Sequence, residues 1–142
     1  MPEVKIQKKA QMIHGLSKKD LIARNGREWT KAASDLVFNF IRLHQDYPIV
    51  VYGKKHDYWN VLRPAFERVD NIEKLPKPER VRDALDMASR SPNLDTYFLD
   101  DVLEKCGFDR RIEDAYHDAR EDAEHCGKVY MHLIKLEDPK KP

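Results

Sequence analysis

The segment 117–122, with the sequence HDARED, begins with His117 and ends with Asp122. A carboxylate binds a hard divalent cation through oxygen, and a nearby imidazole titrates close to neutrality, so it can accept a proton from an attacking water. Apolar residues recur at helical spacing over 119–134, which places Asp122 in the first turns of a long helix and His117 just before it. The segment therefore contains the parts of a hydrolytic metal site, although an acidic helix start also serves as a cap.

A second carboxylate, Asp57, follows the apolar run Pro48–Tyr52 and Gly53. A continuous, β-branched apolar run closed by glycine is typical of a strand that is buried on both faces of a sheet. Asp57 then either caps the helix that follows or binds a metal ion. The ring of Tyr58 or of Trp59, next to Asp57, is a candidate for stacking on a terminal base, whereas the helical spacing of Trp59 favours a position in the core.

The remaining pattern is mostly helical. We expect helices from residue 17 onward and at 29–44, 57–69, 83–89, 99–106 and 119–134, and strands at 48–52 and 80–84. Pro64 is expected to bend the helix at 57–69, because proline lacks the amide hydrogen that helix continuation needs. The sequence thus predicts one domain over 1–142, of the α/β class, with helices dominating and a small sheet.

The composition excludes some classes of protein. The chain has 142 residues, of which 41% are hydrophobic and 36% charged. No apolar run approaches the roughly 20 residues that cross a bilayer, and no secretory signal is seen, so we expect a cytoplasmic protein without membrane partners. Cys106 and Cys126 have no spacing typical of metal ligands, and we expect reduced thiols.

The net charge of +1 conceals an uneven distribution. Residues 1–31 carry eight Lys or Arg against three Asp or Glu, whereas residues 95–124 carry four against eleven. An acidic segment holds a phosphodiester only if divalent cations lie between them. The basic residues near the N-terminus modestly favour a nucleic-acid partner.

Three segments resemble motifs of one family, the DEDDh-type, DnaQ-like 3′→5′ exonucleases. The segment 117–122 resembles the third motif, His-x-Ala-x-x-Asp. Residues 49–57, an apolar run, a short turn and an aspartate, are similar to the second motif, with Val61-Leu62 following it. The segment IHGLS at 13–17 is similar to one that precedes the first long helix of the family. These landmarks come in the family's order and cover roughly residues 2–136.

The resemblance implies a ribonuclease H-like exonuclease fold and the metal-dependent removal of nucleotides from the 3′ ends of DNA or RNA. It implies that His117 is the general base, and that Asp57 and Asp122 bind Mg²⁺ or Mn²⁺. In this interpretation His14 and Tyr58 contact the substrate.

The chain departs from the family in its acidic motifs. The first motif, an Asp-x-Glu on an N-terminal strand, has no counterpart, because the one Asp-x-Glu here, Asp122 to Glu124, lies in the predicted helix. Tyr52 and Gly53 also replace the usual His-Asn. The resemblance therefore implies an N-terminally truncated fold with a reduced sheet and a weak metal site. Either the chain is a piece of a longer polypeptide, or another chain supplies the missing strands, or the remaining elements have repacked. A homodimer is one expected partner state.

Two other interpretations stay open. The chain is either a catalytically inactive or split exonuclease-like module that binds nucleic acid or a polymerase partner, or a small helical interaction domain whose resemblance is accidental. An Asp-x-Glu strand encoded upstream of Met1 would decide for the enzyme.

Overall fold

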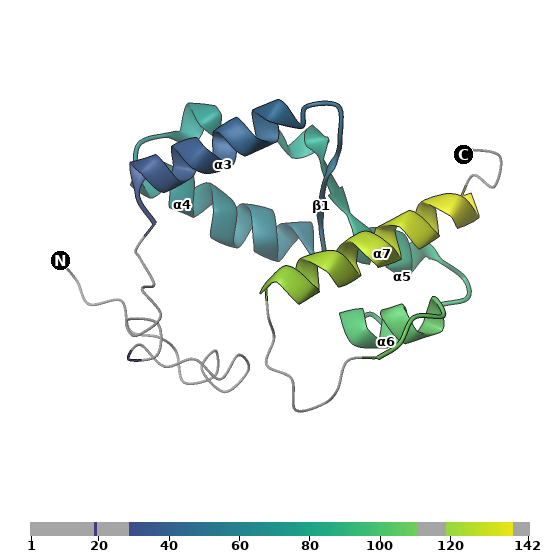
Figure 1. Ribbon diagram of the computed structural model, residues 1–142. Coiled ribbons are helices and arrows are strands. Elements are labelled where there is room, and N and C mark those ends of the chain that lie inside the picture. The colour runs from purple at the N-terminus through teal and green to yellow at the C-terminus, as the bar shows by residue number, and fades with distance from the viewer. Residues whose placement is uncertain (1–18, 20–28, 111–118, 138–142) are drawn as a thin grey trace.

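The computed structural model describes residues 19, 29–110 and 119–137. These residues form an α/β structure dominated by helices around a two-stranded parallel sheet (Figure 1). Of the helix predicted to begin at Ser17, only Lys19 is among the described residues, and it is helical; His14 and His117 lie outside the described residues.

The sheet is formed by β1 (Ile49–Val51) and β2 (Val81–Asp83), which pair in register so that residues 49 and 81 lie opposite each other. A parallel pair needs a long crossover connection. Here the crossover consists of the π-helix η1 (Lys55–Leu62), α4 (Arg63–Arg68), and the 3₁₀ turns η2 (Ile72–Lys74) and η3 (Pro78–Arg80). The other helices are α3 (Lys31–Leu43), α5 (Ala84–Arg90), α6 (Leu99–Lys105) and α7 (Ala119–Glu137).

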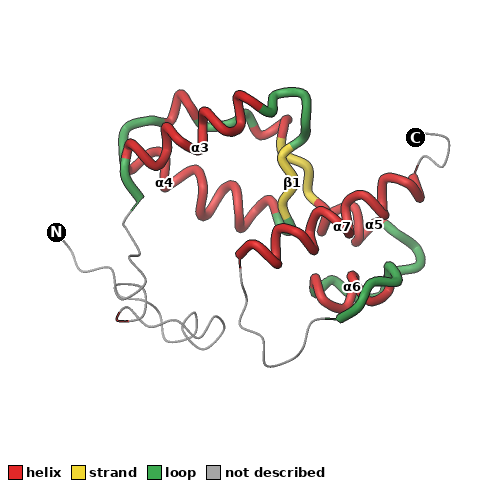
Figure 2. Tube along the Cα trace, in the orientation of Figure 1, coloured by secondary structure: helices red, strands yellow, loops and turns green. Residues whose placement is uncertain are grey.

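The strands lie between two groups of helices (Figure 2). One group contains α3 and α4, and the other contains α5, α6 and α7. The main apolar core belongs to the second group, where the buried side of α7 packs on α5, α6 and β1. Its fully or almost fully buried members are Ala84, Ala88, Val102, Leu103, Val129 and Leu133. The core thus fixes the position of α7 relative to the sheet.

Helix α3 is held to the rest of the chain by polar contacts. The side-chain nitrogen Nδ2 of Asn71, a fully buried residue, donates to Ser34 Oγ at 2.6 Å and to Asp35 Oδ1 at 2.8 Å. The Lys74 ammonium also donates to Asp35 Oδ1, at 2.6 Å. The hydrogen bonds from Lys74 and then Asn71 lower the pKa of the Asp35 carboxyl. Arg80 donates to the carbonyl oxygens at the end of α3, which joins the helix to the start of β2.

The opposite side of α3 is apolar and exposed. Leu36, Phe40 and Leu43 share one helical stripe and are 72%, 64% and 76% exposed. The sequence pattern of an amphipathic helix at 29–44 is confirmed. Its apolar stripe, however, has no cover among the described residues.

Two further expectations need correction. The strand predicted at Pro48–Tyr52 is confirmed, but its residues are only half-buried, and β1 pairs on one edge alone within the described chain. The helix predicted at 57–69 begins at Lys55 and is a π-helix up to Leu62, where the Arg63 amide bonds the Tyr58 carbonyl oxygen. Pro64 then lies just after the junction of η1 and α4, inside one continuous run of helical backbone, because Leu62 and Arg63 both have helical φ and ψ. The change from π-helical to α-helical hydrogen bonding thus falls beside the residue that lacks an amide hydrogen.

Candidate active site

Asp57 and Asp122 line the same pocket, although they belong to segments far apart in the sequence. The pocket has a volume of about 530 Å³ and lies at the carboxyl end of β1, between the starts of η1, α6 and α7. Its lining residues are Val50, Val51, Tyr52, Asp57, Phe98, Leu99, Asp100, Ala119, Asp122, Ala123 and Cys126. The sequence-based interpretation brought two of these carboxylates together, and the structure places both at one cavity.

The position of Asp57 depends on the turn that leaves β1. Gly53 has a φ of +108°, a conformation that glycine adopts without strain. Its carbonyl oxygen accepts the amide hydrogens of His56 and Asp57, each at 2.9 Å, and these bonds start η1. The His56 ring nitrogen Nδ1 lies 3.0 Å from Asp57 Oδ1. Asp57 is thus held in the first turn of η1, with a histidine beside its carboxylate.

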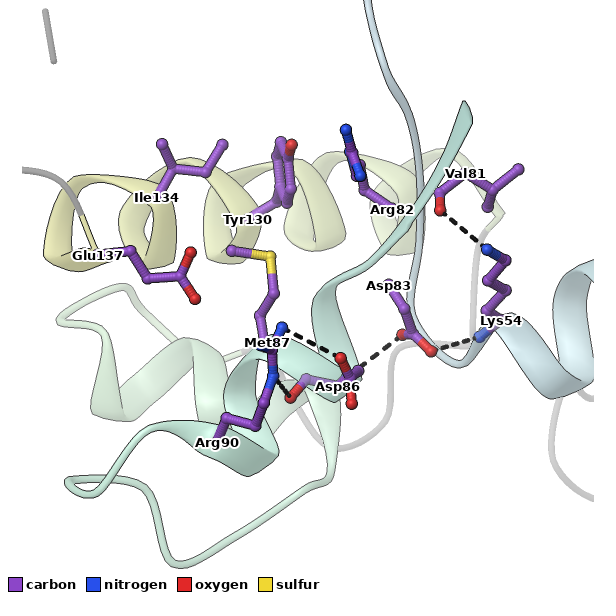
Figure 3. A pocket seen from close by; sticks show the side chains of 10 residues that line it. All are labelled: Lys54, Val81, Arg82, Asp83, Asp86, Met87, Arg90, Tyr130, Ile134 and Glu137. Atoms are coloured by element: carbon purple, nitrogen blue, oxygen red, sulfur yellow. Dashed lines mark hydrogen bonds and ion pairs between the residues drawn. The ribbon is translucent and has the colours of Figure 1, made fainter. Parts of the chain in front are cut away.

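Asp83, at the end of β2, holds this turn from the other strand. Its two carboxylate oxygens accept the amide hydrogens of Gly53 at 2.9 Å and Lys54 at 2.8 Å. The same side chain caps α5 by accepting the amide hydrogens of Leu85 and Asp86, and Figure 3 shows the contact with Asp86. One carboxylate therefore joins the end of β1, the end of β2 and the start of α5. Sequence reasoning assigned no role to Asp83.

Asp122 and Asp100 enter the pocket from two other helices. Asp122 lies in the first turn of α7, one turn before the buried Cys126. Asp100 lies in the first turn of α6 and was missed in the sequence, where it stands in an acidic stretch without a motif. Ala119 also lines the pocket, and His117 precedes it by two residues in the sequence. Carboxylates from three helices, η1, α6 and α7, therefore line the pocket.

The electrostatic effect of these carboxylates is seen at the buried thiol. Burial, and then the negative charges of Asp57 and Asp83, raise the pKa of Cys126 to about 12. Burial likewise raises the pKa of Tyr52, whose hydroxyl donates to the carbonyl oxygen of Tyr97 at 2.7 Å. Both groups stay protonated near neutral pH, so neither adds a negative charge at this end of the strand.

The structure contradicts the substrate-binding role expected for Tyr58. Its side chain is 2% exposed, and its hydroxyl donates to the carbonyl oxygen of Pro76 at 2.5 Å. The π-helical start of η1 turns Tyr58 into the interior, away from the pocket that Asp57 lines. Trp59, expected in the core, is instead 40% exposed, with the Arg63 guanidinium 5.3 Å from its ring centre.

The carboxylates of Asp57 and Asp122 are groups that bind divalent metals, but two of them are too few for a complete metal site. Carboxylate oxygens are the ligands that Mg²⁺ and Mn²⁺ prefer. Within residues 19, 29–110 and 119–137, however, no group of three or more His, Cys, Asp or Glu side chains is arranged to hold a metal ion. Asp57 and Asp122 would thus form only part of a metal site.

A second hollow, of about 620 Å³, is lined by Lys54 and by residues of β2, α5 and α7, Asp83 among them (Figure 3). Its charged residues are largely engaged with the chain itself. The Lys54 ammonium donates to the carbonyl oxygens of Pro78 and Val81, and Arg90 pairs with Asp86 at 3.1 Å. This hollow therefore shows no set of free groups arranged for chemistry.

Comparison with known proteins found no matching family model, no matching curated protein and no matching solved structure. None of the helices in the described part of the chain is long and apolar enough to span a membrane.

Proposed function

We propose that this chain is part of a metal-dependent 3′→5′ exonuclease with a ribonuclease H-like fold, which removes nucleotides from DNA or RNA ends. The observation that carries the proposal is the convergence of Asp57 and Asp122 on one pocket at the carboxyl end of β1. These are the two carboxylates that the motif resemblance selects, and nothing in their local sequence requires them to meet.

The location of the pocket supports the proposal. In open α/β sheets, ligands bind beyond the carboxyl ends of the parallel strands. Asp57 follows β1 directly, and α7 carries Asp122 to the same end because its buried face packs against β1. The fold thus places the acidic residues where this class of protein usually binds its ligand.

The proposed division of labour uses three residues. The carboxylates of Asp57 and Asp122 would hold Mg²⁺ or Mn²⁺, and His117, which lies outside the described residues, would accept the proton of the attacking water. When bound, the metal would stabilise the negative charge that develops on the phosphate oxygens. Cys126 stays neutral beside the carboxylates, so it adds no competing charge at neutral pH.

The free edge of β1 indicates what would complete the site. Within the described residues β1 pairs only with β2, and a two-stranded parallel sheet with an open edge accepts a further strand. A strand that carries an Asp-x-Glu and pairs with this edge would add two carboxylates next to the pocket. We propose that such a strand comes from further sequence of this polypeptide or from another chain, and that residues 1–142 alone are nearly inert.

The test is an exonuclease assay on a 5′-labelled oligonucleotide in Mg²⁺ or Mn²⁺. The chain carries a C-terminal tag and is isolated from its own cells, so that any longer polypeptide or partner is retained, and it is compared with purified residues 1–142. We expect stepwise shortening from the 3′ end by the isolated material and almost none by residues 1–142.

Matched variants locate the activity. Asp57→Ala and Asp122→Ala should abolish it, whereas Glu124→Gln should not, because Glu124 is exposed on the same helix as Asp122, pairs with Arg120 and lies outside the pocket. Absence of nuclease activity in both preparations would favour the inactive nucleic-acid-binding module. Strong degradation by residues 1–142 alone would refute the requirement for an added strand.

A further inference from the structure

Phe98 is the most exposed large apolar side chain in the described part of the molecule, at 79%, and it lines the acidic pocket. An aromatic ring offers a large contact area when it is covered, so an open ring beside a pocket is a surface for a flat ligand. None of the tilted or edge-to-face ring pairs found among the described residues includes Phe98. Both faces of the ring are therefore without an aromatic neighbour there.

The backbone that carries this ring is firmly placed. The carbonyl oxygen of Phe98 accepts the amide hydrogen of Val102 at 2.9 Å, which starts α6, and Val102 is fully buried. One residue earlier, the Tyr97 carbonyl oxygen accepts the hydroxyl of Tyr52 at 2.7 Å, and Tyr52 belongs to the pocket wall at the end of β1. The ring of Phe98 thus projects from a backbone fixed on both sides.

We propose that Phe98 is the surface on which the terminal base of a nucleic-acid substrate stacks. This inference rests on the proposed function, in which the carboxylates of the same pocket hold the cations that face the phosphate. A nucleotide has the two parts that such a pocket would accommodate, a flat aromatic base for the ring and an anionic group for the cations. Because every base has a π face, stacking on Phe98 would tolerate any base. Phe98 takes the role expected of Tyr58, which is buried elsewhere.

The experiment measures binding of adenosine 5′-monophosphate to residues 1–142 in Mg²⁺ by NMR, with ¹³C-labelled phenylalanine rings. Ribose 5-phosphate, which lacks the base, is the second probe. We expect the nucleotide to shift the Phe98 ring resonances and the amides of the pocket, and ribose 5-phosphate to leave the ring resonances unchanged. Phe98→Leu should weaken nucleotide binding about tenfold, the range of one stacking contact, and Phe98→Trp should retain it.

Tyr97→Leu is the matched control, because it removes a neighbouring aromatic side chain, 54% exposed, that does not line the pocket. Its nucleotide affinity should equal that of the unmodified chain. Equal affinity of Phe98→Leu and the unmodified chain, with the pocket amides still shifting, would overturn the stacking role and leave the proposed function standing. A nucleotide that shifts no pocket resonance in the unmodified chain would also overturn the stacking role, whereas the proposed function fails only if the tagged chain isolated from its own cells shows no nuclease activity.

Discussion

Replacing Asp83 should damage the turn that carries Asp57 more than any comparable change at a surface carboxylate. Asp83 accepts amide hydrogens from Gly53, Lys54, Leu85 and Asp86. Loss of the helix cap costs about 1 kcal/mol, and each hydrogen bond to a charged acceptor contributes about 1.5–3 kcal/mol before its exposure to water is considered. Because Asp83 is only half-buried, we expect Asp83→Ala to lower the free energy of unfolding by about 3–4 kcal/mol.

Asp83→Asn is a finer version of the same experiment. Its amide oxygen replaces Oδ1 and still accepts from Gly53 and Leu85, but an amide group replaces Oδ2 and faces the Lys54 amide hydrogen. The expected cost is about 1–2 kcal/mol for one lost bond. Urea denaturation followed by circular dichroism measures both variants. A thermal scan should show a fall in Tm of roughly 10 °C for Asp83→Ala.

The control is Asp86→Asn, three residues further on. Asp86 pairs with Arg90 on an exposed helix face, with side-chain exposures of 62% and 64%, and such pairs contribute under about 1 kcal/mol. An Asp83→Ala variant no less stable than Asp86→Asn would refute the view that Asp83 joins the two strands and α5.

Three further predictions concern the core and the buried polar groups. Leu103→Ala should cost about 2–5 kcal/mol in urea denaturation, because Leu103 is 1% exposed in the core between α6 and α7, and a cost near zero would contradict that core. Tyr58→Phe removes the bond to Pro76 and should cost about 1 kcal/mol without changing nucleotide affinity in the NMR titration, whereas weaker binding would restore Tyr58 to the site. The raised pKa of Cys126 contributes stability below pH about 9 that is lost as the pH rises towards about 12. Cys126→Ala should therefore make the free energy of unfolding fall less steeply at alkaline pH. An unchanged fall would contradict the raised pKa.

The sequence predicted helices correctly where apolar residues at helical spacing face the core. The helical period of α7 was visible because Val129 and Leu133 recur at helical spacing and are buried as expected. That Asp57 and Asp122 would belong to one site was implied by the motif resemblance, and both line one pocket.

The remaining features depend on geometry that a single sequence does not show. The π-helical bonds of η1 shift the direction of each side chain, and Tyr58 therefore points inward while Trp59 is exposed. Phe98 and Asp100 reach the pocket because α6 packs on α7 in the core and because the Tyr52 hydroxyl donates to the Tyr97 carbonyl oxygen next to the start of α6. The prediction that the apolar run at Pro48–Tyr52 forms a strand buried on both faces was wrong, because β1 is half-buried. The burial of β1 depends on what pairs with its other edge, which the apolar run does not show.

The central claim, that the Asp57 and Asp122 pocket binds a divalent metal, is tested most directly by titrating residues 1–142 with Mn²⁺ and following paramagnetic broadening of the amide resonances. Two carboxylates provide less charge than a complete site, so we expect binding on the order of 10⁻⁴–10⁻³ M. Broadening should centre on the amides around Tyr52, Asp57, Leu99 and Ala123, and it should be lost in Asp122→Asn and kept in Glu124→Gln. Broadening centred elsewhere in the described chain, or unaffected by Asp122→Asn, would contradict the claim.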